Sequence, residues 1–427
     1  MSILDMWGFE WGSADIRADY EGITFIFSAF DYGNNPGDGS SPVGNSRFFL
    51  RTDVNGQAIG VVTPQSLPSG SQFWLHFLWR EDSHNTSSPL QFVEWRQGTT
   101  RMGAVRLQSN TGLAEAVVGG NPIVAVDTVA DTFSIAGDVS SLIAIGSQIQ
   151  VQNQGLGNDG FWTVTSVTFS SPNTVIGVQG NIPSPVVGGD LAYPSAATAA
   201  KAIFGCNRWR RVHVHVNLQN TATGWIRVYY DGDLSAPVLD LSSLTTNPGS
   251  LTLDSLAISL SNNGNFIDDL VMMDPLDATG VTDPEKIAYV TISGKAPDAD
   301  GFYSAWTATP GVGADYEDIN DSPPDDASFI QATAINQAST FGFEAADPNN
   351  SITAVKWKGR FLRSDTVAGA NMNVRQRDVS ATTDYDTADI PVPGDGFIFR
   401  TFDQKPGGGD WTVTDFDDTE FGPVSKT

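Results

Sequence analysis

The sequence predicts an all-β protein built from more than one domain. Its 427 residues exceed the usual size of a single domain and suggest two to four. Glycine (43) and proline (23) are frequent, and apolar residues at helical spacing are hard to find. The hydrophobic fraction of 40%, with 24 Phe and 11 Trp, is ample for packed cores. This combination favours sandwiches or barrels whose strands are joined by turns.

The charge of the chain argues against two classes of partner. With 23 basic and 49 acidic residues, the formal net charge is -26, which repels nucleic acid and anionic lipid. High acidity also keeps a protein soluble at high local concentration, and we favour this reading over an acidic binding surface. Cys206 is the single cysteine, so no disulfide framework is expected and folding in a reducing cytoplasm is allowed. The acidic Asp5 and the lack of a basic residue before Arg17 argue against a signal peptide, and no apolar run reaches membrane-spanning length.

The composition changes sharply along the chain and so predicts separate modules. The first 112 residues alternate turn clusters with strand-like runs at 22–30, 46–52, 72–79, 90–97 and 103–108. Residues 113–200 contain no Lys, Arg or His. Five short strands are expected there, at 123–126, 132–135, 148–151, 160–167 and 174–178. A stretch of such different character indicates a module of its own.

Strands of the first kind resume after this module. In the run 211–218, Val212, Val214, Val216 and Leu218 alternate with polar residues, the pattern of a half-buried antiparallel strand. A turn at 220–224 and a return strand at 225–230 complete a predicted hairpin. After residue 274 a proline-broken linker with a short strand at 287–292 leads to a last domain, with strands expected near 371–375, 396–402 and 420–424.

Several of these runs resemble a known family. Trp209, the strand 211–218, the turn at Gly224 and the run 225–232 resemble the central hairpin of laminin G-like, or concanavalin A-like, domains. The run 266–270, Phe-Ile-Asp-Asp-Leu, resembles the closing strand of that fold. The order of the modules also resembles tailed-phage virion proteins, through an opening run at 5–10 and 14–16, a small β-barrel pattern at 126–138 and 158–164, and a C-terminal sandwich pattern at 352–355, 411–412 and 420–422.

The resemblance implies a domain plan. A discontinuous laminin G-like jelly-roll sandwich would take residues 1–112 and 199–284, and a small β-barrel would be inserted at 113–198. A linker at 285–293 would lead to a C-terminal β-sandwich at 294–427. The resemblance also implies a structural protein of the phage virion that assembles in the host cytoplasm and is associated with the tail, as part of a baseplate, fibre or other appendage. Its partners would be other virion proteins and further copies of itself.

Two alternatives stay open: a carbohydrate-binding adhesin or receptor-binding module that contacts a host cell-surface glycan, and a capsid decoration protein. For the adhesin, Trp74, Trp79, Trp95 and Trp225 are aromatic residues that could stack on sugar rings, and we single out Trp74, Trp79 and Trp225. Trp74 and Trp79 lie five apart on one strand and so face opposite sides, with one expected in the core and the other at the surface.

Metal sites are the second kind of candidate. Asp268 and Asp269 could hold Ca²⁺ at a rim of the sandwich, and no other cofactor is expected; a structural role without metal is favoured. His213 and His215 share one strand face and could bind a metal, but two exposed histidines without metal is the favoured reading. The acidic run 315–326 lacks the residue order of a calcium loop and is expected to be solvated.

Catalytic motifs are missing from the sequence. The paired carboxylates of concanavalin-like glycosidases, the H-E-x-x-H zinc motif, the G-x-S-x-G nucleophile motif and the phosphate-binding glycine loops do not occur. We therefore expect a protein that is not an enzyme.

Overall fold

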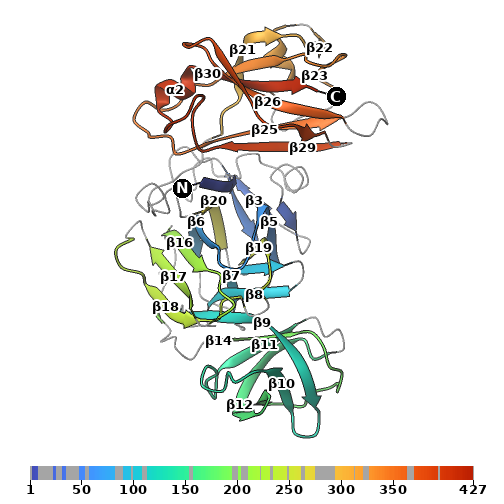
Figure 1. Ribbon diagram of the computed structural model, residues 1–427, viewed down its shortest axis with the longest axis vertical. Helices are drawn as coiled ribbons and strands as arrows, with labels where there is room; N and C mark the ends of the chain where they lie inside the picture. The colour runs from blue at the N-terminus through green and yellow to red at the C-terminus, as the bar shows by residue number, and fades with distance from the viewer. Residues whose placement is uncertain are drawn as a thin grey trace. The chain divides into compact units, whose positions relative to one another are not determined.

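The regular secondary structure of the described residues is almost entirely β-strand in the computed structural model (Figure 1). The structure describes residues 2–7, 23–25, 31–34, 48–52, 57–81, 90–97, 100–107, 113–152, 157–194, 201–202, 210–221, 223–230, 234–247, 250–260, 265–274, 294–311, 313–320, 327–362, 370–392 and 395–426. Two compact units have their main bodies at Leu50–Tyr289 and Val290–Thr427. Within the described residues, no helix is long and apolar enough to cross a membrane.

The first sheet of unit one contains the predicted hairpin. Its strand order is β18-β17-β16-β6-β20-β4. The bounds are β4 Phe48–Thr52, β6 Gln72–Glu81, β16 Arg210–Asn217, β17 Gly224–Tyr230, β18 Leu239–Leu244 and β20 Asn265–Asp274. Val212, Val214 and Val216 are fully buried, as their alternation requires. The hairpin of β16 and β17 is confirmed.

The second sheet of unit one packs against the first. Its order is β9-β8-β7-β19-β5-β2. The bounds are β2 Ile23–Phe25, β5 Gln57–Leu67, β7 Leu90–Gln97, β8 Thr100–Leu107, β9 Leu113–Asp127 and β19 Leu253–Leu260. Phe73 of β6 and Trp95 of β7, both fully buried, meet edge to face with ring centroids 6.1 Å apart. Aromatic contact between the two inner faces makes this a sandwich.

The second sheet continues beyond β9 into a closed six-stranded barrel (Figure 1). The order continues as β9-β14-β11-β12-β13-β10, and β10 pairs back to β9. The added bounds are β10 Thr132–Ala136, β11 Gln148–Gln152, β12 Gly160–Ser170, β13 Asn173–Val178 and β14 Asp190–Pro194. Closure leaves the barrel strands without open edges.

Strand β9 belongs to both the sandwich and the barrel. Residues 114–118 pair with β8, residues 117–122 pair with β14, and residues 123–127 pair with β10. The Asn121 amide donates to the backbone oxygens of Leu191, at 3.0 Å, and Val118, at 3.4 Å. The sequence predicted a short strand at 123–126 because Gly119, Gly120 and Pro122 are typical strand breakers. One 15-residue strand is present instead, since it has hydrogen-bonding partners along its length.

Asn158 and Trp162, from the barrel pattern at 158–164, hold parts of the barrel together. Phe133 is fully buried and meets Trp162 edge to face at 5.7 Å. Asn158, also fully buried, donates to the Ser184 oxygen at 2.8 Å and accepts from the Ser184 nitrogen at 3.1 Å. The Trp162 indole donates to the Asn158 backbone oxygen at 2.9 Å. This asparagine therefore ties the loop before β14 to the start of β12.

The second unit is also a sandwich. Its main sheet has the order β21-β24-β30-β26-β27, with β28 paired to β26, and a two-stranded antiparallel sheet of β25 and β29 forms the second layer. The bounds are β21 Pro297–Ser304, β24 Ser339–Phe343, β25 Val355–Leu362, β26 Asn371–Asp378, β27 Thr383–Asp386, β28 Ile390–Pro391, β29 Asp395–Phe402 and β30 Thr419–Ser425. Trp357 of β25 and Ile398 of β29 pack on Met372, Val374 and Phe421 of the main sheet.

Shorter elements complete the described chain. They are β1 Ser2–Trp7, β3 Asp31–Asn34, β15 Lys201–Ala202, β22 Thr307–Thr309, the 3-10 helix η2 Asp315–Asp318, β23 Phe329–Gln331 and α2 Val413–Asp417. The predicted fold class, an all-β sandwich with an inserted barrel and a C-terminal sandwich, is confirmed. The expected linker at 285–293 and its strand lie outside the described residues.

Candidate functional site

One face of the first sheet gathers histidine and aromatic side chains. The antiparallel register places His213 opposite His76 and His215 opposite Trp74. On the other side of β16 the partners are Tyr229 for His213 and Arg227 for His215. Because directly opposed residues point to the same side of a sheet, these side chains form one cluster, which we call the histidine face. The valines between them point into the sandwich core.

The histidines of this face are buried. His76 and His213 are fully buried, and His215 is 5% exposed. The Nδ1 atoms of His76 and His213 lie 3.3 Å apart, and His215 Nε2 lies 3.2 Å from the Gln72 side-chain oxygen. Burial, helped by the charge of Arg211, lowers the pKa of His213 from 6.5 to about 3. Burial and the charge of Arg227 lower the pKa of His215 to about 2, so both rings are neutral near pH 7.

The expectation that His213 and His215 are exposed is therefore wrong. Alternation correctly placed them on one face, but it could not show that this face is covered. Trp74 supplies part of the cover, since it stacks on His215 with centroids 3.9 Å apart and on Tyr229 at 5.3 Å. The edge of Trp225 meets His215 at 4.2 Å.

The tryptophans proposed as glycan contacts differ in burial. Trp74 is 3% exposed and Trp79 is fully buried, so the expectation that one of them reaches the surface is wrong. They do face opposite sides: Trp74 joins the histidine face, and Trp79 meets Phe77 edge to face at 6.5 Å on the core side. Trp225 is half-buried and keeps part of its ring accessible.

Trp225 forms the accessible rim of the histidine face. The Arg227 guanidinium lies over its ring, 4.6 Å from the centroid, and the Arg227 Nε donates to Asp240 Oδ1 at 3.1 Å. The Arg227 and Asp240 side chains are 36% and 47% exposed, so this ion pair adds little to stability. A partly exposed aromatic ring beside a hydrogen-bond donor and an acceptor can hold a sugar ring.

The structure does not test the calcium site proposed at Asp268 and Asp269. Asp268 and Asp269 lie in β20, where Asp268 pairs with Leu78, but their side chains fall outside the described residues. No group of three or more His, Cys, Asp or Glu side chains that could hold a metal occurs among the residues with described positions. The calcium proposal at Asp268 and Asp269 stays a prediction.

The start of the acidic run in the second unit is held by hydrogen bonds to Asp300 of β21. Residues 315–318 form η2, and the Asp300 carboxylate accepts from the backbone nitrogens of Asp315, at 3.1 Å, and Tyr316, at 2.8 Å. Burial and the charges of Asp300 and Asp318 raise the pKa of Asp315. Residues 321–326 of the same run lie outside the described positions.

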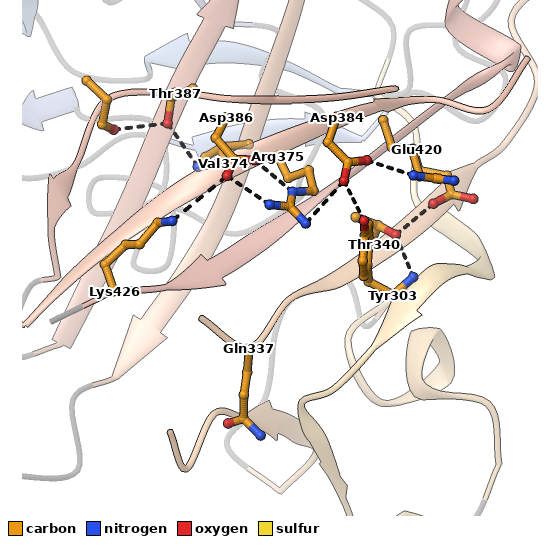
Figure 2. A network of polar contacts seen from close by, with 12 residues as sticks. Tyr303, Gln337, Thr340, Val374, Arg375, Asp384, Asp386, Thr387, Glu420 and Lys426 are labelled. Carbon is orange, nitrogen blue, oxygen red and sulfur yellow. Dashed lines mark hydrogen bonds and ion pairs between the residues drawn. The ribbon is translucent and has the colours of Figure 1, made fainter. Parts of the chain in front are cut away.

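A second polar cluster lies on the outer face of the C-terminal sheet, and Figure 2 shows Asp384 joining its parts. Asp384 accepts hydrogen bonds from Tyr303 and, at 2.8 Å, from Arg377, and it pairs with Arg375 at 3.4 Å. Arg375 also binds both carboxylate oxygens of Asp386, at 2.7 and 2.9 Å. Burial alone would raise the pKa of Asp384, but these donors lower it below its ordinary value.

An irregular stretch of β21 completes this cluster. The register of β21 on β24 shifts between Asp300 and Ser304. Arg377 lies over the ring of Phe302, 3.9 Å from its centroid, and Arg375 lies over Tyr303 at 4.8 Å. The Glu420 carboxylate accepts from the Phe302 nitrogen at 2.8 Å. The cluster fastens β21 to β26, β27 and β30, so we read it as structural.

Replacing Asp384 by alanine tests that reading. Arg377 is only 8% exposed in its side chain, so loss of its partner leaves a nearly buried charge uncompensated. We expect the free energy of unfolding of the second unit to fall by about 1.5 to 3 kcal/mol. Lys426→Ala is the control, because Lys426 reaches the same network only through a 3.9 Å ion pair and should change stability by less than about 0.5 kcal/mol. Urea unfolding curves measure the stability of both variants, and hydrogen exchange in β26 gives the local readout. Equal losses of stability in Asp384→Ala and Lys426→Ala would contradict a structural role for the cluster.

Comparisons with known proteins found similar solved structures but no matching family or curated protein. No protein-family model matches the sequence, and no curated protein matches it. An endo-β-1,4-glucuronan lyase from the fungus Trichoderma reesei has a TM-score of 0.33 and 12% identity over 62% of this chain and 91% of that chain. A mutant alginate lyase in complex with an alginate tetrasaccharide has a TM-score of 0.27 and 11% identity over 64% and 98%.

A third similar structure is the receptor binding domain of botulinum neurotoxin mosaic serotype C/D. Its TM-score is 0.31 at 9% identity, over 93% of this chain and 81% of that chain. These likenesses extend to the β architecture alone. The expectation that this chain is not an enzyme stays a prediction.

Sequence reasoning missed several residues of the histidine face. His76 escaped notice because it lies in an apolar run with Phe73, Leu75 and Phe77. Its spacing of two from Trp74 was the available signal, because it places both side chains on one strand face. Arg227 and Asp240 could not have been joined from sequence, since their contact depends on the register of β17 and β18.

Proposed function

We propose that this chain is a structural component of a tailed-phage virion, associated with the tail as part of a baseplate, fibre or other appendage. The observation that supports this most is strand β9, which is hydrogen-bonded in the sandwich at its start and in the barrel at its end. A module joined through a continuous strand transmits force through backbone hydrogen bonds. An appendage that bears load during attachment needs such a connection.

The partners in this proposal are other virion proteins and further copies of the chain. The net charge of -26 disfavours contact with the packaged nucleic acid and keeps many copies soluble before assembly in the host cytoplasm. The order of the three β-modules, which resembles that of phage virion proteins, agrees with this role. A capsid decoration protein would use the same contacts at another location.

Carbohydrate binding is the second candidate, and Trp225 favours it. Its ring is partly exposed at the rim of the histidine face, and Arg227 and Asp240 offer a donor and an acceptor beside it. A protein at the tip of a tail appendage would use such a rim to contact a host cell-surface glycan. The two candidate functions are thus compatible in one chain.

Each candidate function has its own test. Virions banded in a density gradient and washed with high salt and nuclease should retain the chain at a fixed ratio to the major virion proteins, as measured by quantitative mass spectrometry. Loss of the chain from infectious particles would contradict the virion proposal. Glycan-array binding that Trp225→Ala abolishes, with Trp306→Ala of the second unit as the control, would support carbohydrate binding, whereas binding that Trp225→Ala leaves intact would contradict a role for this rim.

A further inference from the structure

The contact between His76 and His213 joins two identical ring atoms. Both residues are fully buried, and their Nδ1 atoms lie 3.3 Å apart, which is hydrogen-bond distance. A neutral imidazole carries one N–H and one acceptor nitrogen, so one ring must donate from Nδ1 and the other must accept there. Two imidazolium rings would each direct an N–H at the other. The contact therefore exists only while at most one proton lies between the rings.

The second nitrogen of His213 shows where an added proton would go. Among the described residues none gives His213 Nε2 a hydrogen bond. We assign the proton of neutral His213 to Nδ1, from which it donates to His76, because an unpaired acceptor is better tolerated in a protein interior than an unpaired N–H. His213 Nε2 is then a basic nitrogen in a buried position, and protonation there would create a buried cation without a partner.

The charged groups around the cluster oppose such a cation. Arg211 on β16 and Arg227 on β17 are positive, and Tyr229 on β17 is neutral near pH 7. The one described carboxylate facing the cluster, Asp240 on β18, already pairs with Arg227 and is 47% exposed. Asp268 on β20 pairs with Leu78 in the backbone, and its side chain is outside the described set.

We propose that His76, His213 and His215 form an acid-sensitive latch between β6 and β16. The neutral rings hold the two strands together at neutral pH, and proton uptake opens the sheet at this junction. The junction divides the sheet, with β18, β17 and β16 on one side and β6, β20 and β4 on the other. Acidification would thus release the β16–β18 group from the rest of the sandwich.

The direction of the pH dependence follows from the protonation of the open state. In the folded state burial keeps the pKa of His213 near 3 and that of His215 near 2, whereas exposed histidine binds a proton below about pH 6.5. The opening equilibrium is therefore unaffected above pH 6.5. Below it, each of these histidines increases opening about tenfold per pH unit, down to its folded-state pKa. Two histidines give about a hundredfold increase in opening between pH 7.5 and 5.5.

Nuclear magnetic resonance of the full chain tests the first half of the proposal. The sequence has four histidines, so ¹⁵N-histidine labelling gives four ring pairs, and single substitutions assign them. We expect His213 to remain neutral at pH 5.5, with its proton on Nδ1, whereas His84, the one histidine outside β6 and β16, serves as the comparison ring. A His213 ring that is half protonated near pH 6.5 would overturn the proposal.

Hydrogen exchange tests the second half. Protection factors, which correct for the intrinsic effect of pH, should fall about a hundredfold in β6 and β16 between pH 7.5 and 5.5, and stay constant in β26 and β30. His213→Gln should reduce this hundredfold change to about tenfold, and the matched variant His84→Gln should leave it at about a hundredfold. If His213→Gln does not fold, the wild-type measurement still decides. Unchanged protection in β6 and β16 at pH 5.5 would overturn the latch.

Discussion

Replacing Gly422 by alanine is expected to unfold the second unit or to lower its free energy of unfolding by at least about 3 kcal/mol. A Cβ at this position of β30 would lie 1.8 Å from the backbone oxygen of Ser339 and 2.7 Å from the Cα of Thr340. Backbone atoms of a paired strand cannot rotate away as a side chain can. The close approach of β24 and β30 therefore depends on the missing side chain.

A neighbouring glycine provides the control. A Cβ at Gly342 of β24 would meet nothing nearer than 3.5 Å, which is an ordinary contact distance. Gly342→Ala should keep the unfolding midpoint of the second unit close to that of the wild type. Urea unfolding curves of both variants make the comparison, with hydrogen exchange in β24 and β30 as the local readout. Equal stability of the two variants would contradict the observed strand spacing.

Replacing Phe133 by alanine is expected to destabilise the barrel by about 3 to 5 kcal/mol. The ring is fully buried in a cluster that includes Ile135, Ile176 and Leu191, and it meets Trp162 edge to face. Its removal leaves a cavity in a small closed core that has little freedom to collapse. Protection from exchange in β10, β12 and β13 should fall correspondingly.

Phe169→Ala is the matched control for the barrel. Phe169 lies on β12 but is 40% exposed, so its truncation should change stability by no more than about 1 kcal/mol. Trp162 is one of 11 tryptophans in the chain, so hydrogen exchange in β10, β12 and β13 is the readout for the barrel in both variants. A Phe133→Ala variant as stable as Phe169→Ala would mean that the barrel core is not packed around this ring.

The strands predicted from the sequence are those that pair with a strand nearby in the chain and that have one apolar and one polar face. The run 90–97 is β7, and the runs 211–218 and 225–230 match β16 and β17 within a residue. Each shows alternation or a bounded apolar run, and the hairpin turn lies between its two strands in sequence. Strands β18 and β19 were missed, although Leu239 and Leu241 of β18, and Leu256, Ile258 and Leu260 of β19, alternate with small or polar residues.

One feature of the candidate site and one of the fold depend on long-range packing and could not be predicted. The burial of His213 and His215 requires Trp74 from β6, which is distant in sequence and reaches them through strand register. The continuity of β9 through Gly119 and Pro122 requires partners on both edges, one of them β14, some 70 residues later. Local pattern gives the face of a side chain, whereas tertiary contacts decide whether that face meets solvent.

A density map of the assembled phage particle tests the central proposal most directly. The proposal predicts several copies of the chain at the tail, with the sandwich, the barrel and the C-terminal sandwich each fitting ordered density, and with continuous density for β9 between the first two. Particles that carry no density for these modules, and that remain infectious when the chain is absent, would contradict a structural role in the virion.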